Sequence, residues 1–161
     1  GKKSQNVFSF LIGRVFMFSV REKGFEIVQM NNLTTEELIR EGEYSGVNKE
    51  LTSNNFPFRV CQSSKEVKKI RFVEIITDCF VSDVLLFANT QKFKELTYED
   101  ALLFGAQNKG LYNKTLCFLH KPWDEKNLVI REDTEKRHLD LYYVYSRMVR
   151  RMSFLFPFIE D

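Results

Sequence analysis

The first part of the chain alternates between apolar residues and other side chains. The apolar face consists of Phe8, Phe10, Ile12, Phe16, Phe18 and Val20. Period-two alternation that is rich in aromatic and β-branched residues predicts one long strand over Val7–Val20. Gly13 at its midpoint predicts a bulge or bend, which would let the strand serve two sheets of a small barrel. Lys23-Gly24 predicts a turn into a second strand at Phe25–Met30, which makes a hairpin.

A short helix is predicted after this hairpin. Thr34 or Thr35 is suited to accept a hydrogen bond from the first free amide groups, and the two glutamates that follow favour the positive end of the helix. Gly42 ends the pattern, and a polar stretch then predicts a surface loop over Ser45–Pro57. We treat residues 33–61 as an insertion between strands.

The middle of the chain carries further strand and helix patterns. A capping box of Thr97 and Asp100 predicts a helix over Thr97–Phe104. The apolar runs around it predict four strands, at Lys69–Thr77, Ser82–Asn89, Thr115–Lys121 and Leu128–Ile130. The first two are separated by only a few residues, so we expect them to form a tight hairpin.

Apolar residues in the last part of the chain recur at spacings of three and four. They are Leu141, Val144, Tyr145, Met148, Val149, Met152 and Leu155, and basic side chains fall between them. This spacing predicts an amphipathic helix over residues 133–157, about six turns long. Asp133-Thr134 would cap this helix, and Pro157 would end it.

The order of these predicted elements resembles that of the OB-fold, a small five-stranded Greek-key barrel. The stretches that carry the resemblance to telomere-type OB domains are residues 72–78 (FVEIITD) and 83–88 (DVLLFA), followed by Phe93 and Leu96. The resemblance implies binding of single-stranded DNA, or pairing with another OB subunit through the final helix. A pleckstrin-homology-like barrel capped by the same helix accounts for the content nearly as well.

The predicted fold class is therefore mainly β (α+β). We expect one domain, a small closed or partly open antiparallel barrel over residues 7–132 that holds the insertion and its short helix, with the long helix of residues 133–157 packed on it. The length of 161 residues fits one domain, and 43% hydrophobic with 29% charged residues fits a folded globule rather than a disordered chain.

Charge and cysteine content narrow the function classes. The net charge of +2 argues against wholesale binding of polyanions but leaves room for a local basic patch. The three widely spaced cysteines predict reduced thiols in an intracellular protein. We expect it to be nuclear, as part of a larger assembly. The apolar stretch of residues 7–20 is too short and too polar to cross a membrane as a helix. We expect no cofactor, no membrane partner and no small-molecule substrate.

Metal and catalytic motifs do not stand out. His120 and His138 lie 18 residues apart and no Cys-x-x-Cys spacing occurs, so no metal is expected. Cys117 and His120 would face opposite sides of a strand, which predicts a buried thiol and a half-exposed ring rather than a catalytic pair. A metal-dependent nuclease is the remaining enzymatic alternative, built on Glu74, Asp78 and Asp83. The main expectation is no catalytic residue at all.

Basic residues lie beside aromatic residues at several places along the chain. Cations that track phosphates and flat rings that stack on bases are what a single-stranded nucleic-acid site needs. The candidate nucleic-acid-binding residues are Lys69, Arg71, Lys92, Phe93, Lys94, Lys121 and Trp123. Trp123 follows Pro122 and is the favoured stacking ring.

The apolar end of the predicted helix suggests a protein partner. The candidate partner-binding residues are Met148, Met152, Leu155, Phe156 and Phe158. Together these patterns predict a non-catalytic binding module of a larger assembly, which binds single-stranded nucleic acid or a partner subunit, or both. A pure protein–protein interaction domain is the alternative.

Overall fold

A computed structural model of the chain describes residues 4–11, 14–30, 32–59, 66–110, 113–133, 135–145, 148–149 and 154–161, with the backbone alone up to residue 17. The helices of this part are α1 (Thr35–Glu41), α2 (Val81–Thr90) and α3 (Tyr98–Gln107). The strands are β1 (Ser4–Leu11), β2 (Arg14–Arg21), β3 (Phe25–Val28), β4 (Gly46–Val47), β5 (Val67–Ile75), β6 (Cys79–Phe80), β7 (Thr115–Cys117), β8 (Asn127–Asp133), β9 (Lys136–Tyr142), β10 (Met148–Val149) and β11 (Phe154–Glu160).

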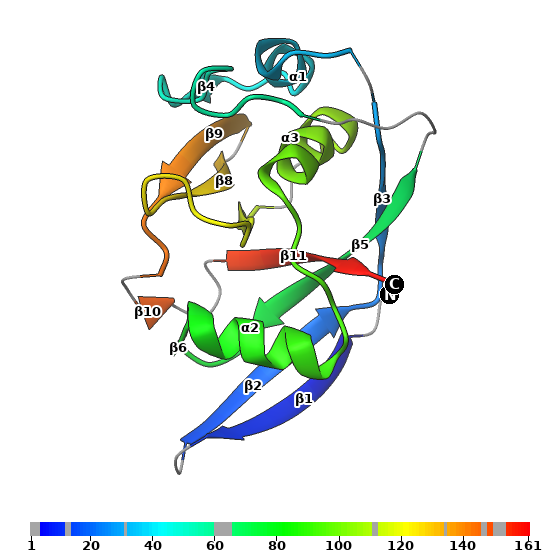
Figure 1. The fold of residues 1–161 in the computed structure, drawn as a ribbon. Coiled ribbons are helices and arrows are strands. Elements are labelled where there is room, and N and C mark those ends of the chain that lie inside the picture. Colours follow the sequence, from blue (N-terminus) through cyan, green and yellow to red (C-terminus); the bar gives the residue numbers. More distant parts are fainter. Residues whose placement is uncertain are drawn as a thin grey trace.

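One mixed sheet holds nine of these strands. Its order is β1-β2-β5-β11-β7-β8-β9-β4, and β3 also pairs with β5. The β11–β7 and β4–β9 pairs are parallel, and the other pairs are antiparallel. In the described chain β1 and β4 lie at opposite ends of this order, so the sheet is open (Figure 1). The predicted barrel, closed or partly open and antiparallel, is therefore wrong, although the protein is mainly β.

The long N-terminal strand of the prediction is a hairpin. β1 and β2 pair along their whole length, with Leu11 opposite Arg14, and the predicted bend at Gly13 lies outside the described residues. β2 and β3 then follow the same edge of β5, since Val20 pairs with Val73 and Phe25 with Ile70. The nine-residue β5 is long enough to pair with both strands. The turn predicted at residues 23–24 therefore separates two strands that pair with β5 in succession, and it does not connect the two strands of a hairpin.

The predicted strand at Ser82–Asn89 is helix α2. Its buried residues Val84, Phe87 and Ala88 recur at spacings of three and four, and the carboxylate of Asp83 accepts a hydrogen bond from the amide of Phe80 at 2.9 Å. Such a carboxylate satisfies an amide at the start of a helix that has no intrahelical partner. A capping aspartate and helical spacing thus explain why this apolar run is a helix and not a strand.

The predicted C-terminal helix of residues 133–157 is also wrong. The structure describes part of this segment, and the elements there are the strands β9, β10 and β11. In β9 the buried side chains alternate with half-buried ones, at Arg137, Leu139 and Leu141, as the two faces of a strand require. Pairing with β8 over its seven residues supplies β9 with hydrogen bonds that are distant along the chain. Of the residues with three-and-four spacing, Leu141 lies in β9, Met148 and Val149 in β10 and Leu155 in β11, so the pattern runs across separate strands.

Pro157 lies inside β11 rather than at the end of a helix. Ile159 exchanges backbone hydrogen bonds with Lys94, and Leu155 pairs with Leu116 of β7. Alternate residues of a strand point their N–H groups to the same side, so the nitrogen of Pro157 faces the gap between these two partners. The missing N–H therefore leaves no ladder position unpaired.

Two sequence predictions depend on local chemistry and are confirmed. Helix α1 begins after Thr34, whose hydroxyl accepts from the amide of Glu37 at 3.1 Å. Helix α3 begins after Thr97, and Thr97 and Asp100 satisfy each other's backbone amides at 3.0 and 3.1 Å. Both are N-terminal caps that involve residues three apart, so their signal is fully contained in a short window.

Helices cover both faces of the sheet. Along β5, Ile70 and Phe72 belong to an apolar cluster with α1 and α3, whereas Val73 and Ile75 belong to a second cluster with α2. In Figure 1, α1 and α3 lie at the upper end of the molecule and α2 lies lower, in front of the β2–β5 region. The sheet therefore separates two cores, and its central strands are apolar on both faces.

Gly105 of α3 packs against the ring of Tyr44, and this contact gives a first prediction. A Cβ at position 105 would lie 1.8 Å from the Tyr44 hydroxyl oxygen. Alanine usually stabilises a helix relative to glycine, but here we expect Gly105→Ala to lower the free energy of unfolding by about 1–3 kcal/mol through overpacking. Urea unfolding measures the change.

A double variant, which combines Gly105→Ala with Tyr44→Phe, serves as the comparison for Gly105→Ala alone. The next nearest atoms to the added Cβ are Cζ of Tyr44 and Cδ1 of Ile130, at 3.2 and 3.3 Å, so removal of the hydroxyl relieves the clash. The hydroxyl of Tyr44 is buried without a hydrogen bond among the described residues, so its loss costs little. A single Gly105→Ala variant that is as stable as the wild type would contradict this packing.

Candidate functional site

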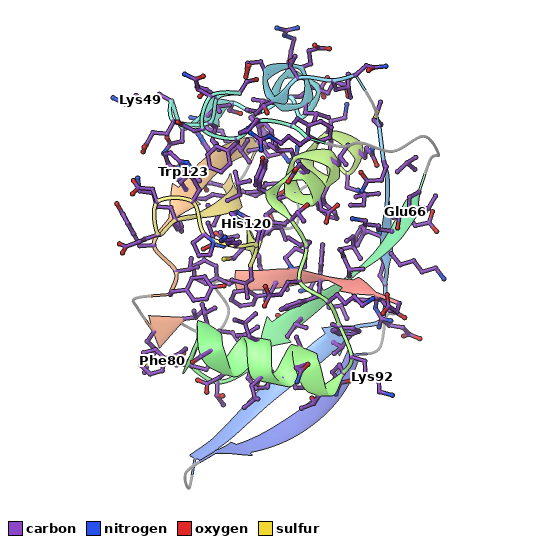
Figure 2. All side chains as sticks on the ribbon, viewed as in Figure 1. Lys49, Glu66, Phe80, Lys92, His120 and Trp123 are labelled. Carbon is purple, nitrogen blue, oxygen red and sulfur yellow. The ribbon has the colours of Figure 1, made fainter. Side chains whose placement is uncertain are left out.

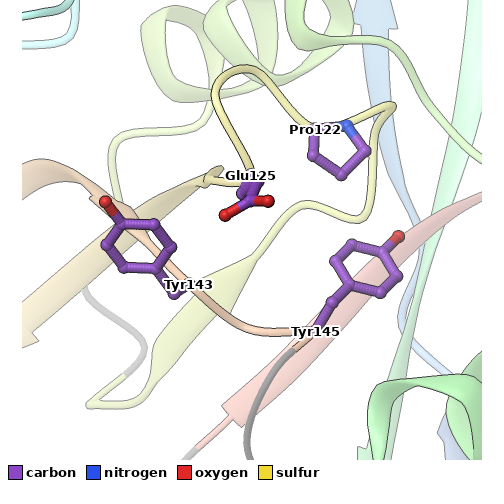
Figure 3. A pocket seen from close by; sticks show the side chains of 4 residues that line it. All are labelled: Pro122, Glu125, Tyr143 and Tyr145. Atoms are coloured by element: carbon purple, nitrogen blue, oxygen red, sulfur yellow. The ribbon is translucent and has the colours of Figure 1, made fainter.

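A pocket of about 440 Å³ lies beside the turn that connects β7 to β8. Its lining residues are Pro122, Glu125, Tyr143 and Tyr145 (Figure 3). Tyr143 and Tyr145 are 44% and 41% exposed, which is unusual for large aromatic side chains. The two rings stand on either side of the Glu125 carboxylate in Figure 3. The pocket thus combines two flat apolar walls with one carboxylate.

Glu125 belongs to a tight turn with an uncommon backbone. Trp123 and Lys126 exchange both of their backbone hydrogen bonds, at 2.9 and 2.8 Å, across Asp124 and Glu125. The φ angles of these two central residues are 49° and 63°. A two-residue turn with positive φ at both centres favours Asn-Gly, so a glutamate at the second position costs about 1–2 kcal/mol. The chain keeps a strained residue at the point where its side chain enters the pocket.

Two buried polar side chains fix the segment that carries this turn. Asn127 donates through Nδ2 to the carbonyl oxygens of Phe118 and His120, at 3.0 and 2.8 Å. The Nε2 atom of His120 accepts from the amide of Leu128 at 3.0 Å, so Nδ1 carries the proton and donates to the carbonyl oxygen of Lys121 at 2.7 Å. These bonds hold both ends of the turn and position the pocket before any ligand arrives.

Aromatic and cationic contacts connect the turn to the core. The Nζ atom of Lys126 lies 5.4 Å from the ring centroid of Trp123 and 5.3 Å from that of Tyr143. Trp123 in turn packs on the fully buried Phe56, with ring centroids 5.0 Å apart. Lys126 also pairs with Glu50 at 3.1 Å. Lys126, which is held in place by Glu50, therefore contacts the ring of Tyr143 that forms one wall of the pocket.

Among the described residues that line the pocket, the only charged one is the acidic Glu125. Glu125 is exposed and has no hydrogen bond or ion pair within the residues that the structure describes. Burial raises the pKa of the Tyr145 phenol to about 12, and the nearby carboxylate of Glu95 contributes to this increase. Lys126, whose Nζ lies 5.3 Å from the ring centroid of Tyr143, is already neutralised by Glu50 and by Asp124 at 3.4 Å. The pocket is therefore suited to a cation rather than to an anion.

Relief of the turn strain gives a second prediction. Glycine adopts a φ of 63° without steric cost, so we expect Glu125→Gly to raise the free energy of unfolding by about 0.5–1 kcal/mol. This net value is the strain relieved, about 1–2 kcal/mol, less the greater freedom of glycine in the unfolded chain. Urea unfolding measures the change. Asp124→Gly is the matched control, with a similar gain at φ 49°. A loss of stability in both variants would show that the turn is unstrained.

The predicted nucleic-acid residues do not form one surface. Figure 2 shows Trp123 and Lys92 far apart, on opposite sides of the molecule. Lys121 is exposed beside the turn, whereas the ring of Trp123 is half-buried against Phe56. Phe93 is also half-buried and stacks on Phe158, with ring centroids 6.4 Å apart. Both predicted stacking rings therefore already have packing partners, namely Phe56 and Lys126 for Trp123, and Phe158 for Phe93.

The remaining predicted cations lie near the end of β11, where carboxylates surround them. Lys69 and Lys94 line a groove of about 420 Å³ that Glu66, Glu95, Glu160 and Asp161 also line. Lys94 pairs with Asp161 at 2.9 Å. Arg71 donates to Glu160 at 2.8 Å and to the carbonyl oxygen of Arg21 at 2.9 and 2.8 Å. The groove is thus of mixed charge.

The predicted partner-binding residues also do not form one surface. Leu155, Phe156 and Phe158 are at most 1% exposed within β11, because this strand lies in the middle of the sheet. Met148 is 45% exposed on β10, directly opposite Phe80, which is 40% exposed. Met152 lies outside the described residues. Only Met148 of this set is therefore shown at the surface.

The carboxylate of Glu74 is paired with basic side chains, and the thiols of Cys79 and Cys117 are buried. Burial opposes ionisation of Glu74, but hydrogen bonds from Lys114 and Arg21 outweigh it and lower the pKa of this carboxyl. Burial raises the pKa of the Cys79 thiol to about 12, and it also raises that of Cys117. The ring of His120 is buried rather than half-exposed. Within the described ranges no three His, Cys, Asp or Glu side chains gather as metal ligands.

The sequence analysis missed the tyrosines and the glutamate of the pocket. The spacing pattern places Tyr145 on the apolar face of a helix, and no sequence pattern singled out Glu125. Two features of the sequence indicate the turn and the strand end that form the pocket. Asp124-Glu125 follows Trp123 as a polar pair of turn length, and Tyr142-Tyr143 with Tyr145 is a run of aromatic residues typical of a strand end.

No family model matches the chain, and neither a curated protein nor a solved structure is significantly similar to it. The fold and the pocket define its class only as a mixed-sheet protein with helices on both faces and an open, tyrosine-walled pocket. Of the helices in the described residues, none has the length and apolar character needed to span a membrane.

Proposed function

We propose that this chain is a non-catalytic protein-binding module that holds a short segment of a partner protein in the pocket of Tyr143 and Tyr145. The single observation that supports this proposal is the pair of exposed tyrosine rings around a carboxylate that has no partner among the described residues. Tyrosine offers a large, rigid contact area at low entropic cost, and it is enriched at protein interfaces.

The size of the pocket fits this use. A volume of about 440 Å³ is sufficient for one or two amino-acid side chains and is at the small end for binding sites. Three residues of extended chain span at most about 11 Å, so Met148 lies within that distance of Tyr145 along the backbone. Met148 pairs with Phe80, and both are exposed. Met148 and Phe80 thus form a second exposed apolar pair on β10 and β6, within a short length of chain from the pocket.

A library of random peptides displayed on phage tests the proposal. We expect the wild-type protein to enrich peptides that bind at least about 10-fold more weakly to Tyr145→Ala, because truncation of a central aromatic side chain costs 1–2 kcal/mol or more. Val47→Ala is the matched control, since Val47 is 41% exposed on the edge strand β4 and does not line the pocket. Failure to enrich any peptide, or equal binding by Tyr145→Ala, would overturn the proposal.

Binding of single-stranded nucleic acid stays a prediction and has its own arm in the experiment. A fluorescent oligonucleotide at low salt replaces the peptide, and anisotropy reports binding. Nucleic-acid binding would weaken with salt, with a slope set by the few phosphates that Lys69, Lys92 and Lys94 neutralise. Binding with that slope, lost on substitution of these lysines and unchanged by Tyr145→Ala, would favour the nucleic-acid function over the one proposed.

A further inference from the structure

We propose that the pocket takes an arginine side chain of the bound segment, with the guanidinium stacked on the tyrosine rings and paired with Glu125. This inference rests on the proposed function and names the group that the partner presents. The observations that carry it are the two aromatic walls, the carboxylate between them, and the strained turn that places this carboxylate there.

The charge of the pocket selects a cation. Glu125 has no hydrogen-bond or ion-pair partner in the described residues, and Glu95 lies close enough to Tyr145 to raise the pKa of its phenol. Lys126 is bound to Glu50 and Asp124, so it does not neutralise Glu125. A carboxylate or phosphate group in the pocket would meet an unpaired negative charge at short range, whereas a cation would pair with it.

The shape of the pocket favours a guanidinium over an ammonium group. Tyr143 and Tyr145 remain 44% and 41% exposed, so the pocket is open to water and does not enclose its occupant. An ammonium group is compact and strongly hydrated, and it gains little from an open aromatic wall. A guanidinium is planar and weakly hydrated, so it stacks on a ring while its edge donates two hydrogen bonds to a carboxylate.

The backbone of the turn supports a role for Glu125 in particular. A glycine at this position would remove the strain that the φ of 63° imposes, and the glutamate contributes no hydrogen bond or ion pair to the described fold. Strain that persists without a structural benefit is typical of binding sites. The carboxylate is therefore kept for a contact that forms only with the ligand.

Two small molecules test the inference without knowledge of the partner. N-acetyl-arginine amide and its neutral isostere N-acetyl-citrulline amide are titrated to tens of millimolar into the isotope-labelled protein, and amide NMR shifts are followed. We expect the arginine compound to shift the amides of residues 123–126 and 143–145, and to bind at least about 5-fold more tightly than citrulline, because only the guanidinium carries charge. N-acetyl-lysine amide should bind more weakly than the arginine compound.

Glu125→Gln is the decisive variant. It keeps the size of the side chain and removes its charge, so we expect the arginine compound to bind this variant no better than citrulline does. Asp124→Asn is the matched control, because it removes a neighbouring charge of the same turn and should keep the preference for arginine. Equal affinity for the two compounds in the wild type, absence of shifts at the pocket, or an unchanged preference in Glu125→Gln would overturn the inference.

The two proposals fail in different ways. Peptides that depend on Tyr145 but show no arginine preference would keep the protein-binding function and overturn the arginine inference. A library that enriches no peptide would overturn the function, and the amide titration would still decide whether the pocket prefers a guanidinium. The spectra of each variant also report whether it is folded, so a loss of binding is not confused with a loss of structure.

Discussion

Replacing Arg137 with methionine is expected to lower the free energy of unfolding by about 3–5 kcal/mol. The guanidinium of Arg137 is buried in β9 and donates to the carbonyl oxygens of Gly42, Gly105 and Asn108, at 2.7, 3.0 and 3.0 Å. Its Nε lies 3.8 Å from a carboxylate oxygen of the buried Glu132. The variant leaves three carbonyl groups without this donor and a buried negative charge without this cation, and each is costly. Urea unfolding measures the difference.

Arg131→Met provides the control for this prediction. Arg131 belongs to the adjacent strand β8, but its side chain is 43% exposed and lies 3.9 Å from Asp140. Exposed ion pairs contribute about 0–1 kcal/mol, so this variant should be nearly as stable as the wild type. The guanidinium of Arg137 also lies 4.7 Å from the ring centroid of Tyr44, so one side chain joins α1, α3 and the sheet. A loss below about 1 kcal/mol in Arg137→Met would show that this junction is not needed.

The second large effect is the loss of stability on acidification, through His120. Burial lowers the pKa of His120 from 6.5 to about 4 in the folded protein. The unfolded chain therefore binds more protons between these values, and stability falls as the pH falls. The contribution is complete above pH 6.5 and is lost as the pH approaches 4. Since each pKa unit corresponds to about 1.4 kcal/mol, the loss reaches about 3 kcal/mol.

Protonation of His120 has a direct structural cost. Its Nε2 accepts from the amide of Leu128, and a protonated ring would place two donors against each other. His120→Gln removes the titrating group, so the difference in unfolding free energy between wild type and variant should shrink or change sign from pH 7 to pH 4. Wild type and variant share the same carboxyl groups, including Glu74, so the pH-dependent contributions of these groups to stability cancel in the comparison. A constant difference across that range would contradict the assignment of the pH effect to His120.

How much of the fold the sequence predicted depends on how local each signal is. The caps at Thr34 and Thr97 involve residues three apart, and both helices begin where expected. The helix predicted after Asp133 was wrong because the spacing of its apolar residues fits a helix. The strands that this segment forms instead pair with other strands, and some of these, such as β5, are far away in the sequence. Pairing of β11 with β5, eighty residues earlier, is invisible to any window of fifteen residues.

The candidate site shows the same limit. Trp123 was expected in a loop after Pro122, and it does begin a tight turn next to the pocket. Its ring was expected to stack on bases, but it packs on Phe56, which belongs to a loop almost seventy residues earlier. The tyrosines of the pocket are adjacent to Glu125 only because β8 and β9 pair. Residue type suggests chemistry, but tertiary pairing decides which residues share a site.

The position of β11 has a consequence for biosynthesis. This strand is the last of the sheet to leave the ribosome, yet in the described pairings it alone joins the β1–β2–β5 side to the β7–β8–β9 side. Until it emerges, the nascent polypeptide holds two incomplete half-sheets whose inner edges are open to other chains. This sheet is therefore completed only after β11 has been translated, and the interval before that is when chaperones would protect it.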